Sequence, residues 1–142
     1  MALFKFCKAI YEGTAIDVYN YGKMLRDFTY IDDIVEGVVR IMEVVPAASE
    51  SVGASASTAS PRYRLYNIGH NEPVELTRLI ELLEKTIGKK ATIKWLPLQP
   101  GDVPVTYADI EELGRVTGYR PKTPIEVGVR RFVEWYREYY KI

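Results

Sequence analysis

The sequence has 142 residues, of which 47% are hydrophobic and 27% are charged, as is usual for one globular domain. Lysine plus arginine and aspartate plus glutamate both total 19, so the chain lacks the net basic charge that nucleic-acid binding uses. No apolar run approaches a membrane span, and the N-terminal segment lacks the pattern of a signal peptide. The single cysteine, Cys7, forms no internal disulfide and favours a reducing, cytoplasmic location. We therefore expect no nucleic-acid or membrane partner.

The first part of the chain predicts a helix, a hairpin and a second helix. Residues 1–11 carry apolar side chains at helical spacing, and Gly13 follows as a stop. Residues 16–21 and 23–30 are typical of two strands joined by a turn at Gly22. A helix then begins near Asp32 and Asp33, whose carboxylates suit its positive end. Its apolar face consists of Ile31, Ile34, Val35, Val38, Ile41, Met42 and Val45.

The second part alternates short strands with helices. Residues 47–61 are small and polar, which predicts a flexible loop within a single domain that spans residues 1–142. Strands are expected at residues 64–68 and 92–96. Helices are expected at residues 74–87, ending at Gly88, and at residues 109–115, with Asp109 as the N-cap. For the last helix, Thr123 is the predicted N-cap, with Pro124 at the first helical position and Glu126 completing a capping box.

Arg26 is the strongest candidate ligand-binding residue. It follows the turn at Gly22 and precedes the helix near Asp32, an arrangement that holds a guanidinium in place. A guanidinium stays charged and forms two parallel hydrogen bonds, which suits phosphate. The open alternative is an ion pair between Arg26 and a neighbouring aspartate, namely Asp27, Asp32 or Asp33.

Catalytic and metal-binding patterns are missing from the sequence. It has no Gly-x-Gly-x-x-Gly loop for a dinucleotide, no Ser-His-Asp set and no cluster of metal ligands. Tyr19 and Lys23 have the spacing of a tyrosine–lysine catalytic pair, but they lie across a predicted strand and turn rather than one helical turn apart. We therefore predict no catalytic residue and no metal site.

Several motifs in order resemble the C-terminal, substrate-binding part of the extended short-chain dehydrogenase/reductase family. They are residues 1–13, Arg26 to Gly37, Tyr66-Asn67-Ile68-Gly69, Gln99-Pro100-Gly101-Asp102-Val103, Tyr107-Ala108-Asp109 and residues 132–136. Within that family, the chain is most similar to nucleotide-sugar epimerases of the UDP-glucuronate 4-epimerase type. The resemblance implies a mixed α/β fold with helices on a few short strands. It also implies that the chain is a fragment lacking the N-terminal Rossmann domain.

The resemblance further implies an activity and its residues. The complete enzyme uses NAD, held by the missing domain, to invert C4 of a UDP-sugar such as UDP-glucuronate through a 4-keto intermediate. In this chain Arg26 corresponds to the diphosphate-binding arginine, Tyr19 and Asn20 to nucleoside contacts, and Asp102 to the aspartate near the ribose. The uracil pocket would be lined by Ala2, Leu3 and Phe6. Gln99 stands where many relatives carry a second phosphate-binding arginine, and the Gln-Pro-Gly-Asp run favours the glucuronate branch.

The fragment alone is expected to be inactive and free of cofactor. The strand at residues 66–68 would join the missing sheet, so exposed edges or helices favour a homodimer. Two alternatives remain open at this point. One is a related 4,6-dehydratase or decarboxylase on the same scaffold, and the other is a free-standing module that binds a nucleotide or a protein without catalysis.

Overall fold

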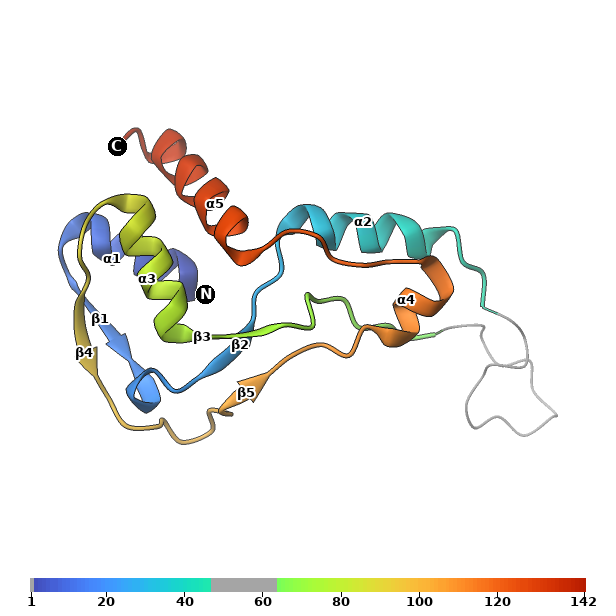
Figure 1. Cartoon of the computed structure of the whole chain (residues 1–142), viewed down its shortest axis with the longest axis horizontal. Helices are drawn as coiled ribbons and strands as arrows, with labels where there is room; N and C mark the ends of the chain where they lie inside the picture. Colours follow the sequence, from blue (N-terminus) through green and yellow to red (C-terminus); the bar gives the residue numbers. More distant parts are fainter. Residues whose placement is uncertain (1, 47–63) are drawn as a thin grey trace.

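A computed structural model describes residues 2–46 and 64–142. The fold is mixed α/β, as predicted, with five α-helices, five short strands and one 3-10 helix among the described residues (Figure 1). In chain order these are α1 (Ala2–Glu12), β1 (Ala15–Val18), η1 (Tyr19–Gly22), β2 (Leu25–Asp27), α2 (Ile31–Met42), β3 (Pro73–Glu75), α3 (Leu76–Ile87), β4 (Thr92–Trp95), β5 (Val105–Thr106), α4 (Glu111–Thr117) and α5 (Ile125–Tyr140). None of the helices in this part of the chain has the length and apolar character that crossing a membrane requires.

The hydrophobic core lies where α1, α3 and α5 meet β1. Apolar side chains recur at helical spacing on α1, α3 and α5, so each of these three helices turns one apolar face inward. Cys7 of α1, Leu79 of α3 and Val133 of α5 are completely buried there. Figure 1 shows these three helices gathered at one end of the molecule, with α2 and α4 at the other.

The strands form two small sheets, and the predicted hairpin is wrong. β1 pairs in parallel with β4, whereas β2 is the central strand of a second sheet, antiparallel to β3 and parallel to β5. The connecting turn η1 contains Asn20, Tyr21 and Gly22, with φ of 48°, 51° and 82°. After this turn the chain enters the second sheet, where β3 and β5 occupy both edges of β2, while β4 pairs with β1.

Three local predictions also differ from the structure. Residues 64–68, predicted as a strand, do not form one, because no described strand pairs with their backbone. α4 begins two positions later than predicted, although the Asp109 carboxylate still accepts a hydrogen bond from Glu111 N at 3.0 Å. α5 begins at Ile125, and the predicted Thr123 cap is not formed. Instead, the Thr123 N–H donates to the buried Asp33 carboxylate at 3.1 Å, a tertiary contact that replaces the local one.

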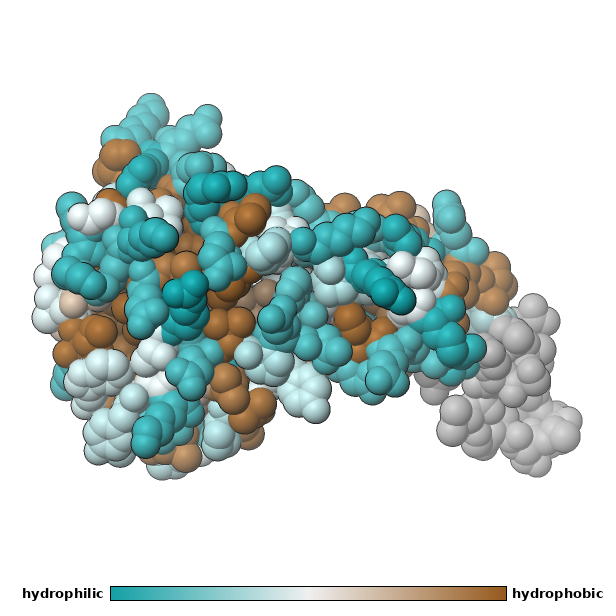
Figure 2. All heavy atoms as spheres, viewed as in Figure 1, coloured by the Kyte–Doolittle hydropathy of each residue, from teal (hydrophilic) through white to brown (hydrophobic). Residues whose placement is uncertain are grey.

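α2 forms as predicted, and much of its predicted apolar face is exposed. Ile31, Val35 and Met42 are exposed, and only Asp33 and Gly37 of this helix are buried. Figure 2 shows hydrophobic side chains reaching the surface along the edge of the molecule where α2 lies. The helical pattern was interpreted correctly, yet no described element covers it. The predicted loop at 47–61 lies outside the described residues.

Candidate functional site

The turn η1 holds Tyr19 at the end of β1. The Asn20 side-chain amide donates to Lys23 O at 3.0 Å, and Tyr21 N donates to Leu96 O at 3.0 Å. Gly22 packs so closely that a Cβ there would lie 2.5 Å from Thr77 Cγ2. The turn is therefore fixed by its own hydrogen bonds and by contact with α3.

Arg26 occupies the middle of β2, between β3 and β5. Its Nη1 donates to the carbonyl oxygens of Leu25, at 2.9 Å, and Pro104, at 3.2 Å. The three neighbouring aspartates have other partners: Asp27 and Asp33 accept from backbone N–H groups, and Asp32 pairs with Arg131. The alternative in which Arg26 forms an ion pair with Asp27, Asp32 or Asp33 is therefore wrong, and its hydrogen-bond partners within the described residues are backbone carbonyl oxygens.

The Asp27 carboxylate fastens the strand that carries Arg26 to both of its neighbours. It accepts hydrogen bonds from the backbone N–H groups of His70, at 3.1 Å, Asn71, at 3.0 Å, and Ala108, at 3.2 Å. These groups precede β3 and follow β5. One side chain thus links three segments that are distant in sequence, and Arg26 stands on the rigid strand between them.

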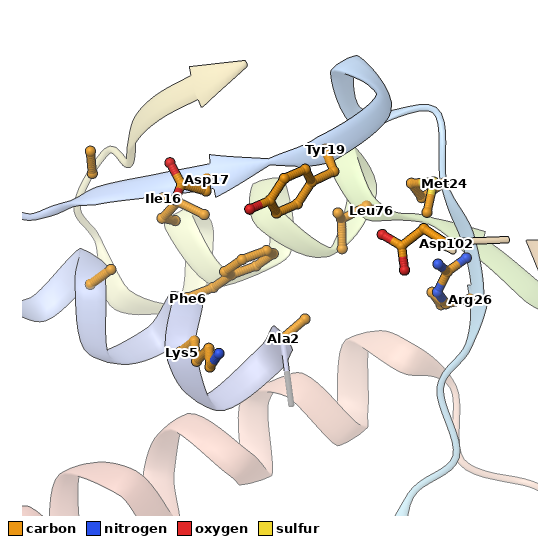
Figure 3. A pocket seen from close by; sticks show the side chains of 12 residues that line it. Ala2, Lys5, Phe6, Ile16, Asp17, Tyr19, Met24, Arg26, Leu76 and Asp102 are labelled. Atoms are coloured by element: carbon orange, nitrogen blue, oxygen red, sulfur yellow. The ribbon is translucent and has the colours of Figure 1, made fainter. Parts of the chain in front are cut away.

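A cavity of about 460 Å³ opens beside Arg26. Figure 3 shows it between α1 on one side and β1 with η1 on the other, with the Phe6 and Tyr19 rings in its middle. Arg26 and Asp102 lie together at one end (Figure 3). Its wall is formed by Ala2, Lys5, Phe6, Ala9, Ala15, Ile16, Asp17, Tyr19, Met24, Arg26, Leu76 and Asp102.

The structure brings together most, but not all, of the predicted binding residues. Five of the eight line this cavity: Ala2, Phe6, Tyr19, Arg26 and Asp102. Leu3 lines a neighbouring, more apolar cavity of about 710 Å³ between the start of α1 and α5, and Ala2 borders both. Asn20 and Gln99 line neither cavity. Gln99 instead contributes its carbonyl oxygen, which accepts from Asp102 N at 3.1 Å.

Lys5 and Asp17 are wall residues that the sequence reasoning missed. Lys5 follows Ala2 by three positions and precedes Ala9 by four, so helical spacing alone places it on the predicted ligand-facing side of α1. Asp17 lies one position from two buried neighbours in β1, and strand alternation turns it away from the core. Helical periodicity could therefore have found Lys5, whereas alternation along β1 does not single out Asp17, because Ala15 and Ile16 line the cavity as well.

The wall combines charged groups with apolar surface. One guanidinium and one ammonium supply positive charge, two carboxylates accept hydrogen bonds, and the remainder is apolar or aromatic. No histidine, cysteine or serine lines this cavity. In the described parts of the chain, no group of three metal-ligating side chains is close enough to hold a metal ion. The site can hold an elongated ligand with a flat apolar part and an anionic part.

Comparisons with known proteins agree with this chemistry. The family model for the NAD dependent epimerase/dehydratase family matches residues 1–69. Protein CapI of Staphylococcus aureus is 49% identical over 146 residues, which cover 99% of this chain and 43% of that protein. UDP-glucuronate 4-epimerase 2 of Arabidopsis thaliana is 39% identical over 145 residues, covering 99% of this chain and 33% of that protein.

Solved structures show the same fold. The UDP-glucuronic acid 4-epimerase from Bacillus cereus, in complex with UDP-glucuronic acid and NAD, matches with a TM-score of 0.80 and 28% identity, covering 99% of this chain and 40% of that chain. The UDP-glucose 4-epimerase of Thermotoga maritima, with UDP-glucose, matches in fold with a TM-score of 0.79 at 22% identity. The chain spans less than half the length of these relatives. It therefore shares its sequence pattern and its fold with one part of the UDP-sugar epimerases.

Proposed function

We propose that this chain is the substrate-binding part of a nucleotide-sugar epimerase of the NAD dependent epimerase/dehydratase family, and that its cavity holds the UDP portion of UDP-glucuronate. The observation that carries the proposal is the Arg26 guanidinium, which borders the cavity and has no carboxylate partner among the described residues. A diphosphate offers the paired oxygens that a guanidinium fork binds well.

The chain's contribution to epimerisation is positional. Phe6 and Tyr19 supply a flat apolar surface for the base, Arg26 binds the diphosphate, and Asp102 accepts a hydrogen bond from the ribose hydroxyls. Binding energy from the UDP that does not react is then used to hold the reacting sugar in place. NAD supplies hydride transfer at C4 in such enzymes. The residues here do not fit NAD, because the sequence has no glycine-rich dinucleotide loop, so we assign it no residue of this chain.

The exposed surface of α2 supports the idea that a further protein unit packs against this chain. The apolar face of α2 is exposed, and the chain corresponds to about 40% of the B. cereus enzyme. We infer that the complete enzyme converts UDP-glucuronate to UDP-galacturonate. This reaction is tested by incubating the longest gene product that contains this chain with UDP-glucuronate and measuring UDP-galacturonate. Release of carbon dioxide would instead identify a decarboxylase, and release of water a dehydratase.

Titration with UDP tests the binding role directly. Arg26→Ala should weaken UDP binding by roughly tenfold or more, the effect of losing a hydrogen-bonded charge pair. Arg130→Ala is the matched control, because Arg130 is an exposed arginine on α5 that lines neither cavity. UDP binding that both variants leave unchanged would contradict the proposed function.

A further inference from the structure

Lys5, an exposed residue, borders the ligand cavity on a helix face that is otherwise apolar. Ala2, Lys5, Phe6 and Ala9 occupy successive helical positions on the side of α1 that lines the cavity. Figure 3 shows Lys5 on α1 near Phe6, with Arg26 and Asp102 grouped elsewhere along the cavity. Lys5 and Arg26, the two cations of the wall, therefore border different parts of the cavity.

The Lys5 ammonium has no partner of its own in the described parts of the chain, where no hydrogen bond or ion pair involves it. Lys8, one helical turn further along α1, differs in this respect because it lies 3.7 Å from the Glu12 carboxylate and lines neither cavity. A lysine ammonium carries three donors and no acceptor. Lys5 thus offers the cavity a pure donor beside the aromatic surface of Phe6.

Resting on the proposed function, we propose that Lys5 determines base specificity by donating a hydrogen bond to the C4 carbonyl oxygen of the bound uracil. Arg26 takes the diphosphate, so the flat base lies toward Phe6 and Tyr19, at the part of the cavity that Lys5 borders. Uracil presents a carbonyl oxygen at C4, which accepts from an ammonium. Cytosine presents an amino group at the same position, and two donors facing each other leave both unpaired.

Binding of UDP and CDP by the purified chain separates this role from a general electrostatic one. The unmodified chain should bind UDP about tenfold more tightly than CDP, the value of one hydrogen bond to a charged group. Lys5→Met should lower UDP affinity by about the same factor and bring the ratio of the two affinities close to one. Methionine is a strong helix former of similar length, so α1 should persist. Pyrophosphate binding should not change.

The same UDP and CDP titrations, repeated on a control variant, show which results would overturn the proposal. Lys8→Met should leave the UDP-to-CDP ratio unaltered. If Lys5→Met weakens UDP and CDP equally, or weakens neither, the base-reading role is overturned. UDP binding that Arg26→Ala does not weaken contradicts the proposed function, while the ratio in Lys5→Met still decides the role of Lys5. If no UDP binds, both proposals fail.

A second variant covers the case in which Lys5→Met does not fold. Lys5→Gln replaces the ammonium with an amide that both donates and accepts, so it should bind UDP and CDP with more nearly equal affinity. An undiminished preference for UDP in this variant would also overturn the assignment.

Discussion

The Arg26 guanidinium donates to the Pro104 carbonyl oxygen at 3.2 Å, and the same oxygen accepts from Leu25 N at 2.8 Å. One carbonyl thus joins β2 to the segment that enters β5. That segment follows the loop that carries Asp102, the predicted ribose contact. The group proposed to bind phosphate and the group proposed to bind ribose are therefore held in fixed relation by the backbone between them.

Arg26→Lys should impair UDP binding although it preserves the charge. Lysine is a point charge without the planar fork, so it cannot bind two phosphoryl oxygens and Pro104 O in one geometry. We expect UDP affinity to fall by roughly tenfold, measured by titration calorimetry. Arg130→Lys on the exposed side of α5 is the control and should have no effect. Full retention of affinity by Arg26→Lys would show that charge alone suffices.

Gly22→Ala should destabilise the chain more than Gly88→Ala does. Both glycines have nearly the same backbone conformation, with φ of 82° and 81°, so both substitutions cost about 1 kcal/mol in backbone strain. Only at Gly22 would the new methyl group also collide with Thr77 and Trp95. Urea unfolding of the two variants isolates the cost of this contact. Equal losses of unfolding free energy would show that η1 moves freely relative to α3.

Tyr119→Phe should make the chain less sensitive to alkaline pH. The buried Tyr119 hydroxyl donates to Gly69 O at 3.2 Å. Burial, followed by the nearby negative charges of Asp33, Glu36 and Asp27, raises its pKa. Its folded-state pKa exceeds the unfolded value of about 10, so its contribution is complete below that pH and disappears above it.

Thermal unfolding between about pH 9 and 11 tests this expectation. At neutral pH, Tyr119→Phe should cost about 1 kcal/mol for the lost hydrogen bond, and the deficit should shrink as pH rises. The exposed Tyr139 provides a control, since Tyr139→Phe should follow the unsubstituted chain. A deficit that stays constant with pH would contradict the assignment.

Local patterns predicted the helices well because helical spacing is a short-range signal. α3, for example, ends at Gly88 as expected, with φ of 81°. Strand pairing was predicted badly, since the partner of Ala15 in β1 is Thr92 in β4, far along the chain. Local turn signals at Gly22 favoured a hairpin. Nothing in the neighbouring sequence indicates which distant strand competes for β1.

The candidate site was predicted in part for the same reason. Arg26 was found because a cation after a turn is a local feature. Lys5 was missed because a lysine in a helix is usually solvated, and only its spacing from Ala2 shows that it shares the ligand-facing side. Periodicity identified the apolar face of α2, but it does not show which element, if any, covers that face.

Cys7 should resist thiol reagents in the folded chain. Burial raises the pKa of its thiol to about 11, with the charge of Arg137 acting in the opposite direction. The thiolate is the reactive form, so at pH 8 almost none is available, and the sulfur is also completely buried. Labelling with a disulfide reagent should therefore proceed only in denaturant, where the thiol becomes accessible. Fast labelling under native conditions would indicate that α1 opens readily.

Val38→Gln combined with Met42→Gln should reduce self-association of the chain. These side chains lie one helical turn apart on α2 and are 43% and 78% exposed. Burying exposed apolar surface contributes a favourable free energy of about 25 cal/mol per Å². A second copy of the chain can bury this surface by packing against α2. We expect the unsubstituted chain to form dimers with rising concentration in light scattering, and the double variant to stay monomeric. Ile142→Gln, an equally polar change at a distant exposed position, should leave dimerisation intact. Unsubstituted chains that remain strictly monomeric at high concentration would contradict this role for α2.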